Sequence, residues 1–239
     1  SNPHIKVPFV KVTSYKNRGM GFFGYVLTDL DFGDSIFADN TVGFTFNSLA
    51  GSSFTAENAV VIGESNNIGN PDVYSCWNCA QCDDYMNPLS KYHRTIPKTW
   101  ARQEILEGIT FNRDGGRQFI DNVAFFNFED NCERAASAIS VRTDDRAFTR
   151  PYNQFVKSVE FHNAKAVHFT YKDPVDVYAS GQKSDGYRSA VIVDQTGELT
   201  QGKPFGGVNA RVIPNNPIMV DGQNCGYVSE WNAYICDKE

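Results

Sequence analysis

The sequence predicts an all-β protein whose short strands wind into a parallel β-helix, with a β-sandwich as the alternative. Helix signals are scarce across the 239 residues, and brief runs of β-branched and aromatic residues recur between Asn, Asp and Gly. The chain holds 21 Asn, several of which close these runs. An Asn at a β-helix turn tolerates left-handed backbone angles, and stacked Asn side chains can hydrogen-bond from coil to coil. A sandwich would more often show Asn-Gly hairpin turns, which are absent, although Asp-Gly occurs at 114–115, 185–186 and 221–222.

Five runs are the clearest strand candidates, because each places β-branched and aromatic residues in brief alternation. They are TVGFTFN (41–47), EGITFN (107–112), NVAFFNF (122–128), KSVEFHN (157–163) and AVHFTY (166–171). Two other segments, TWARQEILEG (99–108) and ERAASAIS (133–140), look helical. The runs are unevenly spaced, so the repeating unit is a strand followed by Asn rather than a strict consensus.

The chain is predicted to form one domain over residues 1–239, since no linker composition interrupts it. Residues 63–98 are polar, rich in turn formers and hold three cysteines, which predicts a loop excursion pinned by disulfides. The N-terminus, SNPHIKVPFV, has neither an initiating Met nor a signal-peptide pattern. We therefore expect either the start of a processed chain or a segment of a larger protein.

The charge balance excludes some partners. The formal net charge is −6 and the isoelectric point is near 5.3, whereas binding to a nucleic-acid backbone needs clustered Lys and Arg. No run approaches the roughly 20 apolar residues of a membrane-spanning helix. The expected partners are neighbouring domains or copies of the same protein, and extracellular glycans, with no nucleic acid and no membrane span in this segment.

The six cysteines form an even set, which favours disulfides in an oxidising compartment. They are Cys76, Cys79, Cys82, Cys132, Cys225 and Cys236. Zinc binding by the 76–82 cluster would need a fourth ligand such as His93 or Cys132. Redox chemistry is disfavoured, because Asp83 and Asp84 would raise the pKa of a neighbouring thiol. Disulfides remain the preferred interpretation.

Paired acids are the candidates for chemistry on a glycan. Asp29 and Asp31 would share one face of a strand, and Asp144 and Asp145 form a second acidic pair. Their oxygens are also the ligands that Ca²⁺ prefers, although no EF-hand spacing is present, and no other cofactor is expected. Solvated turns or strand ends explain such clusters better, so no catalytic residue is assigned.

The last fifty residues carry a family resemblance. SAVIVDQTGELTQG (189–202) is followed by PNNPIMV (214–220) and CGYVSEWNAYIC (225–236). This order resembles the C-terminal part of the β-helix module in fibrocystin and fibrocystin-L, which also occurs in transmembrane protein 2 and the cell-migration-inducing hyaluronan-binding protein. The matching positions are Asp194, Gly197, Leu199, Thr200, Asn216, Pro217, Cys225, Trp231 and Cys236. The resemblance implies a right-handed parallel β-helix from a large extracellular or cell-surface protein, and it transfers no catalytic residue.

The terminal motif suits a closing cap. A β-helix ends in unpaired strand edges and exposed apolar side chains. Tyr227, Trp231 and Tyr234 could cover that end, and a bond between Cys225 and Cys236 could fix the cover, although either cysteine could pair elsewhere.

We therefore expect a structural or adhesive β-helix module of a cell-surface, ciliary-appendage or filament protein. The alternatives are a hyaluronidase-like enzyme and a carbohydrate-binding module. The enzyme requires Asp29, Asp31, Asp144 or Asp145 to converge with a His or Arg in one cleft.

Overall fold

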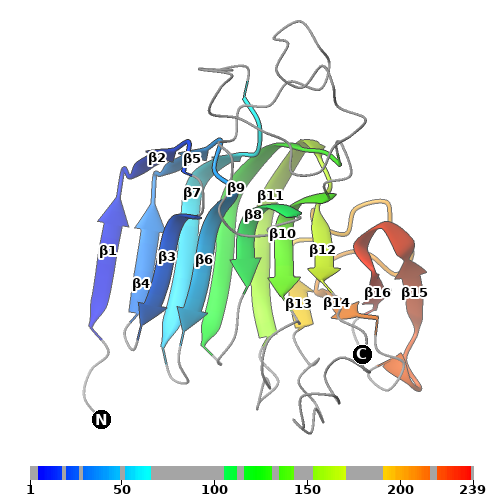
Figure 1. The fold of residues 1–239 in the computed structure, drawn as a ribbon. Coiled ribbons are helices and arrows are strands. Elements are labelled where there is room, and N and C mark those ends of the chain that lie inside the picture. The colour runs from blue at the N-terminus through cyan, green and yellow to red at the C-terminus, as the bar shows by residue number, and fades with distance from the viewer. Residues whose placement is uncertain are drawn as a thin grey trace, which may run out of the picture.

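In the computed structural model the regular secondary structure of the described residues is almost entirely β-strand (Figure 1), so the all-β class is confirmed. It describes residues 5–17, 20–26, 29–48, 52–65, 105–111, 116–130, 135–142, 153–170, 191–215 and 220–237. Of the predicted excursion at 63–98, residues 66–98 lie outside this described part of the chain.

The strands form two sheets. The large sheet has eleven strands, in the order β1 (Lys6–Val10), β4 (Asp29–Gly33), β7 (Ser53–Ile62), β9 (Arg117–Phe128), β11 (Asn153–Ala164), β13 (Val191–Asp194), β14 (Ala210–Pro214), β16 (Ala233–Cys236) and β15 (Cys225–Val228), with β2 (Thr13–Tyr15) and β5 (Ile36–Ala38) beside this path. The small sheet has five strands, in the order β12 (Val167–Thr170), β10 (Ala135–Arg142), β8 (Ile105–Phe111), β6 (Val42–Ser48) and β3 (Met20–Val26).

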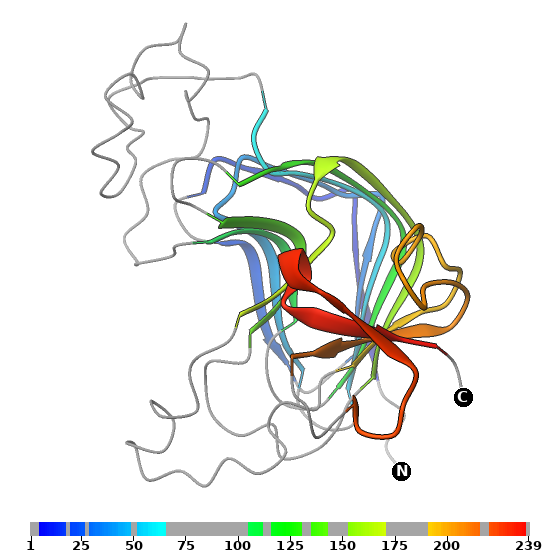
Figure 2. The same ribbon diagram turned by 90° about the vertical axis from the view of Figure 1, so that its right-hand side faces the viewer.

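From β1 to β13 the chain passes alternately through the two sheets, and we call one passage through both a coil. Each strand pairs in parallel with the strand in the same place one coil earlier, as β7 does with β4 and β8 does with β6. Figure 2 shows the two sheets as curved layers that face each other. Parallel pairing throughout these coils does not suit the β-sandwich alternative, whose sheets are antiparallel.

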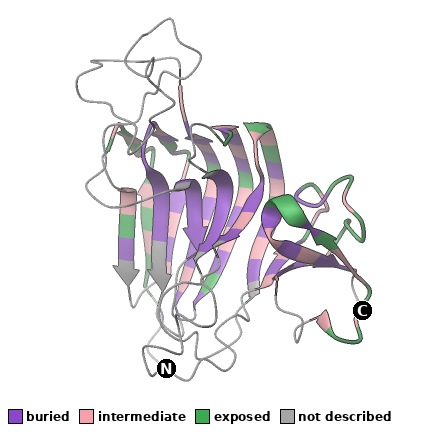
Figure 3. Cartoon of the chain, turned by 45° about the vertical axis from the view of Figure 1, so that its right-hand side comes forward, coloured by how far each residue is buried: buried purple, intermediate pink, exposed green. Residues whose placement is uncertain are grey.

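The core lies between the two sheets, whose strands carry most of the buried residues (Figure 3). It is rich in Phe. Because the strands are parallel and in register, side chains of adjacent coils stack directly. The Phe9 and Phe32 rings stack with centroids 4.8 Å apart, and those of Phe125 and Phe161 lie 5.5 Å apart. Phe32 also meets Phe44 of the small sheet edge-to-face, at 5.4 Å. These contacts join successive coils and both sheets into one core.

The two predicted helices are wrong wherever the structure describes them. Residues 105–108 begin strand β8, and residues 135–140 lie in strand β10. The Ala content that suggested a helix at 133–140 serves another purpose, since Ala136 and Ala138 are fully buried between neighbouring strands. Strands buried on both faces read as continuous apolar runs, and their tertiary packing overrides the weak helix propensity of Ala.

Left-handed corners recur at the same place in the coils from β1 to β11 of the large sheet. Lys11, Asp34, Asn58, Asn122 and Ser158 all have φ between 49° and 59°. The register aligns them, because Glu57 and Ala59 pair with Asp121 and Val123, which pair in turn with Lys157 and Val159. Asn58 and Asn122 are also bonded directly, since the Asn122 side-chain amide donates to Asn58 Oδ1 at 2.7 Å.

A second column of corners follows five residues later, at Lys16, Asp39, Asn127 and Asn163. Gly63 holds the same place in its coil, where a Cβ atom would overlap the carbonyl oxygen of Asn127. Each coil therefore bends twice, and the short segment between the bends forms its own row of parallel pairs. The prediction that Asn supports left-handed turns and bonds between coils is confirmed at these positions.

The corner at Asn122 gives a direct test. Asn122→Ala should lower the free energy of unfolding by about 1–2 kcal/mol, because a Cβ without a polar group is strained at positive φ and the bond to Asn58 is lost. Asn122→Gly loses the same bond but tolerates this φ, so it should be more stable than the Ala variant in urea denaturation. A Gly variant less stable than the Ala variant contradicts the strained-corner assignment.

Candidate functional site

The parallel coils end in an antiparallel cap. Strand β14 pairs antiparallel with β13, β16 pairs with β14, and β15 pairs with β16. The 3₁₀ turn Ser229–Trp231 joins β15 to β16, and Asn232 closes it with a left-handed φ of 50°. The reversal of strand direction prevents the parallel stack from continuing on this side.

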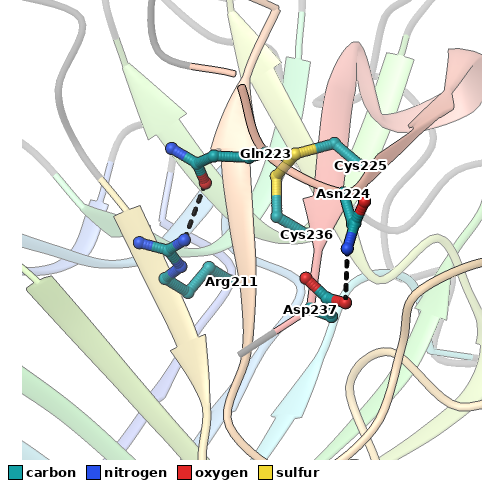
Figure 4. The surroundings of a disulfide bond; sticks show 6 residues. All are labelled: Arg211, Gln223, Asn224, Cys225, Cys236 and Asp237. Carbon is teal, nitrogen blue, oxygen red and sulfur yellow. Dashed lines mark hydrogen bonds between the residues drawn. A yellow bond between two sulfur atoms is a disulfide. The ribbon is translucent and has the colours of Figure 1, made fainter. Parts of the chain in front are cut away.

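A disulfide joins Cys225 and Cys236 across the cap hairpin (Figure 4). The two residues face each other in the β15–β16 register, with their Cα atoms 4.1 Å apart. Polar contacts flank the bond, since Arg211 donates to Gln223 at 2.7 Å and Asn224 donates to Asp237 at 3.4 Å. Cys76, Cys79, Cys82 and Cys132 lie outside the described residues.

Of the three predicted cap aromatics, Trp231 is the one that closes the core. It is 2% exposed and packs in the main hydrophobic cluster, and Lys203 Nζ lies 5.3 Å from its ring centroid. The Tyr227 and Tyr234 rings lie 5.1 Å apart, and Tyr227 is exposed at the surface. The tyrosines therefore pack against each other across the hairpin, while Trp231 seals the end of the stack.

Asp194, the first matching residue of the family-like motif, organises the loop before the cap. It is fully buried, and its carboxylate accepts hydrogen bonds from Gly197 N at 2.9 Å and from both the N–H and the hydroxyl of Thr200 at 2.8 and 2.7 Å. Thr200 Oγ1 in turn accepts from Gly207 N at 2.9 Å. The Asp-x-x-Gly-x-Leu-Thr pattern is thus a hydrogen-bonded loop that positions Leu199 in the core.

A groove of about 810 Å³ lies between strand β11 and the cap. One wall is the segment from Val159 to Ala166, and the other holds residues 198–203 with Glu230 and Trp231. The volume falls within the roughly 300–1,000 Å³ typical of ligand sites. Sequence reasoning missed this groove, because its two walls are far apart in the chain.

Acidic side chains outnumber basic ones in the groove. Lys165 forms an ion pair with Asp130 at 2.8 Å, and Lys203 pairs with Glu230. His162 lies 3.3 Å from Glu160, and its ring stacks on Phe126 at 4.6 Å. Among the described residues no Lys or Arg is paired with Glu160 or Glu198, so two carboxylates remain without a permanent positive partner.

Asp130 is held ionised at the groove edge. Burial would raise the pKa of its carboxyl group, but the hydrogen bonds from Lys165 and from Ala136 N, together with the Lys165 charge, hold that pKa below its usual range. The pair therefore remains a fixed ionic feature of the groove at neutral pH.

A second polar cluster lies in the small sheet. Glu107 is 1% exposed, and its carboxylate accepts from Ser140 Oγ at 2.6 Å and from Thr110 Oγ1 at 3.2 Å. His168 aligns with Ser140 in the next strand, and its buried Nδ1 has no hydrogen-bond partner among the described residues. Burial lowers the pKa of His168, and the charge of Lys165 lowers it further. The charges of Asp130 and Glu107 raise this pKa, but the net shift is downward. In the sequence, this cluster could have been recognised from Glu107, which is a charged residue within the apolar run ILEGITF.

The predicted acidic pair on β4 contacts the two neighbouring strands. Asp29 Oδ1 accepts from the N–H and hydroxyl of Ser53 at 2.6 and 2.9 Å, whereas Asp31 forms an ion pair with Lys6 at 2.6 Å. That hydrogen bond raises the pKa of Lys6. Both carboxylates thus bind adjacent strands together. Asp144 and Asp145 lie outside the described residues.

Within the described ranges, no group of three or more His, Cys, Asp and Glu side chains is arranged to hold a metal ion. No helix in those ranges has the length and apolar character needed to cross a membrane. Comparison with known proteins gives no match, either to a family model or to a curated protein. The features that bear on function are the cap, the groove and the strand edges.

Removal of the cap disulfide should destabilise the chain. The disulfide closes the short loop between Cys225 and Cys236. For a loop of that size, the Cys225→Ser/Cys236→Ser double variant should lose roughly 3 kcal/mol of unfolding free energy, measured by urea denaturation. Ser229→Ala, an exposed change in the same hairpin, is the control. Equal stability of the double variant and wild type, or alkylation of these two thiols without reduction, contradicts the assignment.

His168 should make stability depend on pH. Because its pKa is lower in the folded chain, the unfolded chain binds more protons below about pH 6.5, and the free energy of unfolding decreases as the pH falls toward the folded pKa. His168→Gln should flatten this dependence between about pH 7 and 5.5. An unchanged slope in His168→Gln contradicts the assignment.

Proposed function

We propose that the chain is a structural and adhesive module of an extracellular protein, built as a right-handed parallel β-helix. The alternation between two sheets, the parallel pairing of successive coils and the two columns of corners support this winding. The handedness follows from the general rule that crossovers between parallel strands in a sheet are right-handed in nearly all proteins. The Cys225–Cys236 bond is compatible with an oxidising compartment outside the cytosol.

The difference between the two ends of the stack carries the structural proposal. The cap reverses strand direction at one end and buries Trp231. At the other end, β1 and β3 are the edge strands of their sheets in the described part of the chain. Val10 and Phe23 on these strands are 56% and 52% exposed, and Phe9 and Phe22 are only partly covered. An open edge with exposed apolar side chains favours the addition of further β-structure.

Two features make this open end selective. Pro8 in β1 lacks an N–H, so the edge offers fewer main-chain donors than an uninterrupted strand. Lys6 and Lys11 are exposed at the same end, and charged edges discourage indiscriminate strand pairing. We therefore expect the end to accept a neighbouring coil of complementary charge and shape, from an adjacent module or a second copy.

Self-association of the isolated chain tests the open end, because without a neighbouring module a second copy is the one partner present in solution. Sedimentation velocity should show association that increases with protein concentration. Val10→Lys should weaken this association by about tenfold, since it places a charge on the apolar edge.

Val208→Lys is the matched control, because Val208 is similarly exposed at 63% but lies in the loop before the cap. It should associate like wild type. A chain that stays monomeric at all concentrations, or an equal effect of both variants, contradicts the proposed interface.

A further inference from the structure

The second half of strand β11 has an unpaired edge. Residues Val159 to His162 lie between the left-handed corners Ser158 and Asn163 and pair with β9 on one side. On the other side β13 pairs only with Asn153–Val156, and no described strand continues beside the second half. The groove between β11 and the cap runs along this edge.

Every earlier coil has a strand at this place. The row begins with β2 and β5 and continues through the second halves of β7, β9 and β11. Four residues, roughly 13 Å of extended chain, separate the two corners on β11. The groove therefore occupies the position of the next short strand in a row that is otherwise regular.

We propose that this groove binds an extended peptide of a partner protein, which adds to the β11 edge as one more strand and presents an apolar residue between two basic residues. Main-chain hydrogen bonds to an open edge give affinity in this mode, and pockets for alternate side chains give specificity. The site does not depend on the open N-terminal end, so the two can be tested separately.

The apolar residue of the peptide would lie beside Phe161. In the preceding coils this inward position holds Phe37, Val61 and Phe125, and the Phe125 ring stacks on Phe161. Phe161 is only partly buried, so its ring can be covered from the groove. Leu199 and Trp231 provide apolar surface on the opposite wall.

The basic residues would lie beside Glu160 and His162, which occupy the outward positions on either side of Phe161. Glu160 is 73% exposed and its ion-pair partner among the described residues is His162, while Glu198 adds a second carboxylate on the facing wall. Lys or Arg at the outward positions would pair with these carboxylates. The same charges repel an acidic polysaccharide, which makes a basic peptide the better match.

Fluorescence anisotropy with a labelled octapeptide tests the proposal on the whole chain. The probe has a lysine–phenylalanine–lysine core, and its controls are a glutamate–phenylalanine–glutamate core and the first peptide N-methylated at its three core residues. The lysine probe should bind, while both controls should bind at least about tenfold more weakly. Glu160→Lys should weaken the lysine probe about five- to tenfold, because an attraction becomes a repulsion.

Asp221→Lys provides the charge-matched control, since Asp221 is exposed in the turn before β15 and outside the groove, and it should bind like wild type. Glu198→Lys is a second groove variant and should also weaken binding. Equal binding of the three peptides, or equal effects of Glu160→Lys and Asp221→Lys, overturns the proposal. Binding of a neutral or acidic oligosaccharide in place of the peptide also overturns it.

Discussion

The paired left-handed corners are the constraint on which the rest of the structure depends. Each coil of the large sheet bends at two positions five residues apart, so segments of very different length return to the same register. Asn58 and Asn122 are 64 residues apart in sequence yet share one corner and one hydrogen bond. Because a shift of one residue would move every side chain to the opposite face of its strand, the corners also fix which residues enter the core.

The regular stacking of parallel strands also determines which groups are exposed at the ends of the stack. A row of parallel strands leaves unsatisfied main-chain groups wherever it stops. At the cap, antiparallel strands, a disulfide and Trp231 cover the last coil, while the second half of β11 stays open beside the groove. The opposite end keeps two edge strands with exposed apolar residues. Binding at either place would complete the sheet rather than form a new kind of interface.

Local sequence patterns predicted the strands well where polar and apolar residues alternate, and the Asn-rich turns pointed correctly to left-handed corners. The patterns failed at 105–108 and 135–140, where burial on both faces removes the alternation, and at 135–140 Ala also mimics a helix. The Cys225–Cys236 pair could be suggested but not chosen from several pairings. The groove and the Glu107–Ser140 cluster depend on contacts between distant segments, which no local pattern encodes.

Nuclear magnetic resonance of the corner residues tests the common register most directly. In the proposed coils, Asn58, Asn122 and Ser158 each have positive φ and align on adjacent strands. Their amides should give the strong intraresidue Hα contacts of left-handed residues, together with contacts between Asn58 and Asn122 and between Asn122 and Ser158. Negative φ at these positions, or contacts shifted by one residue along either strand, would contradict the account.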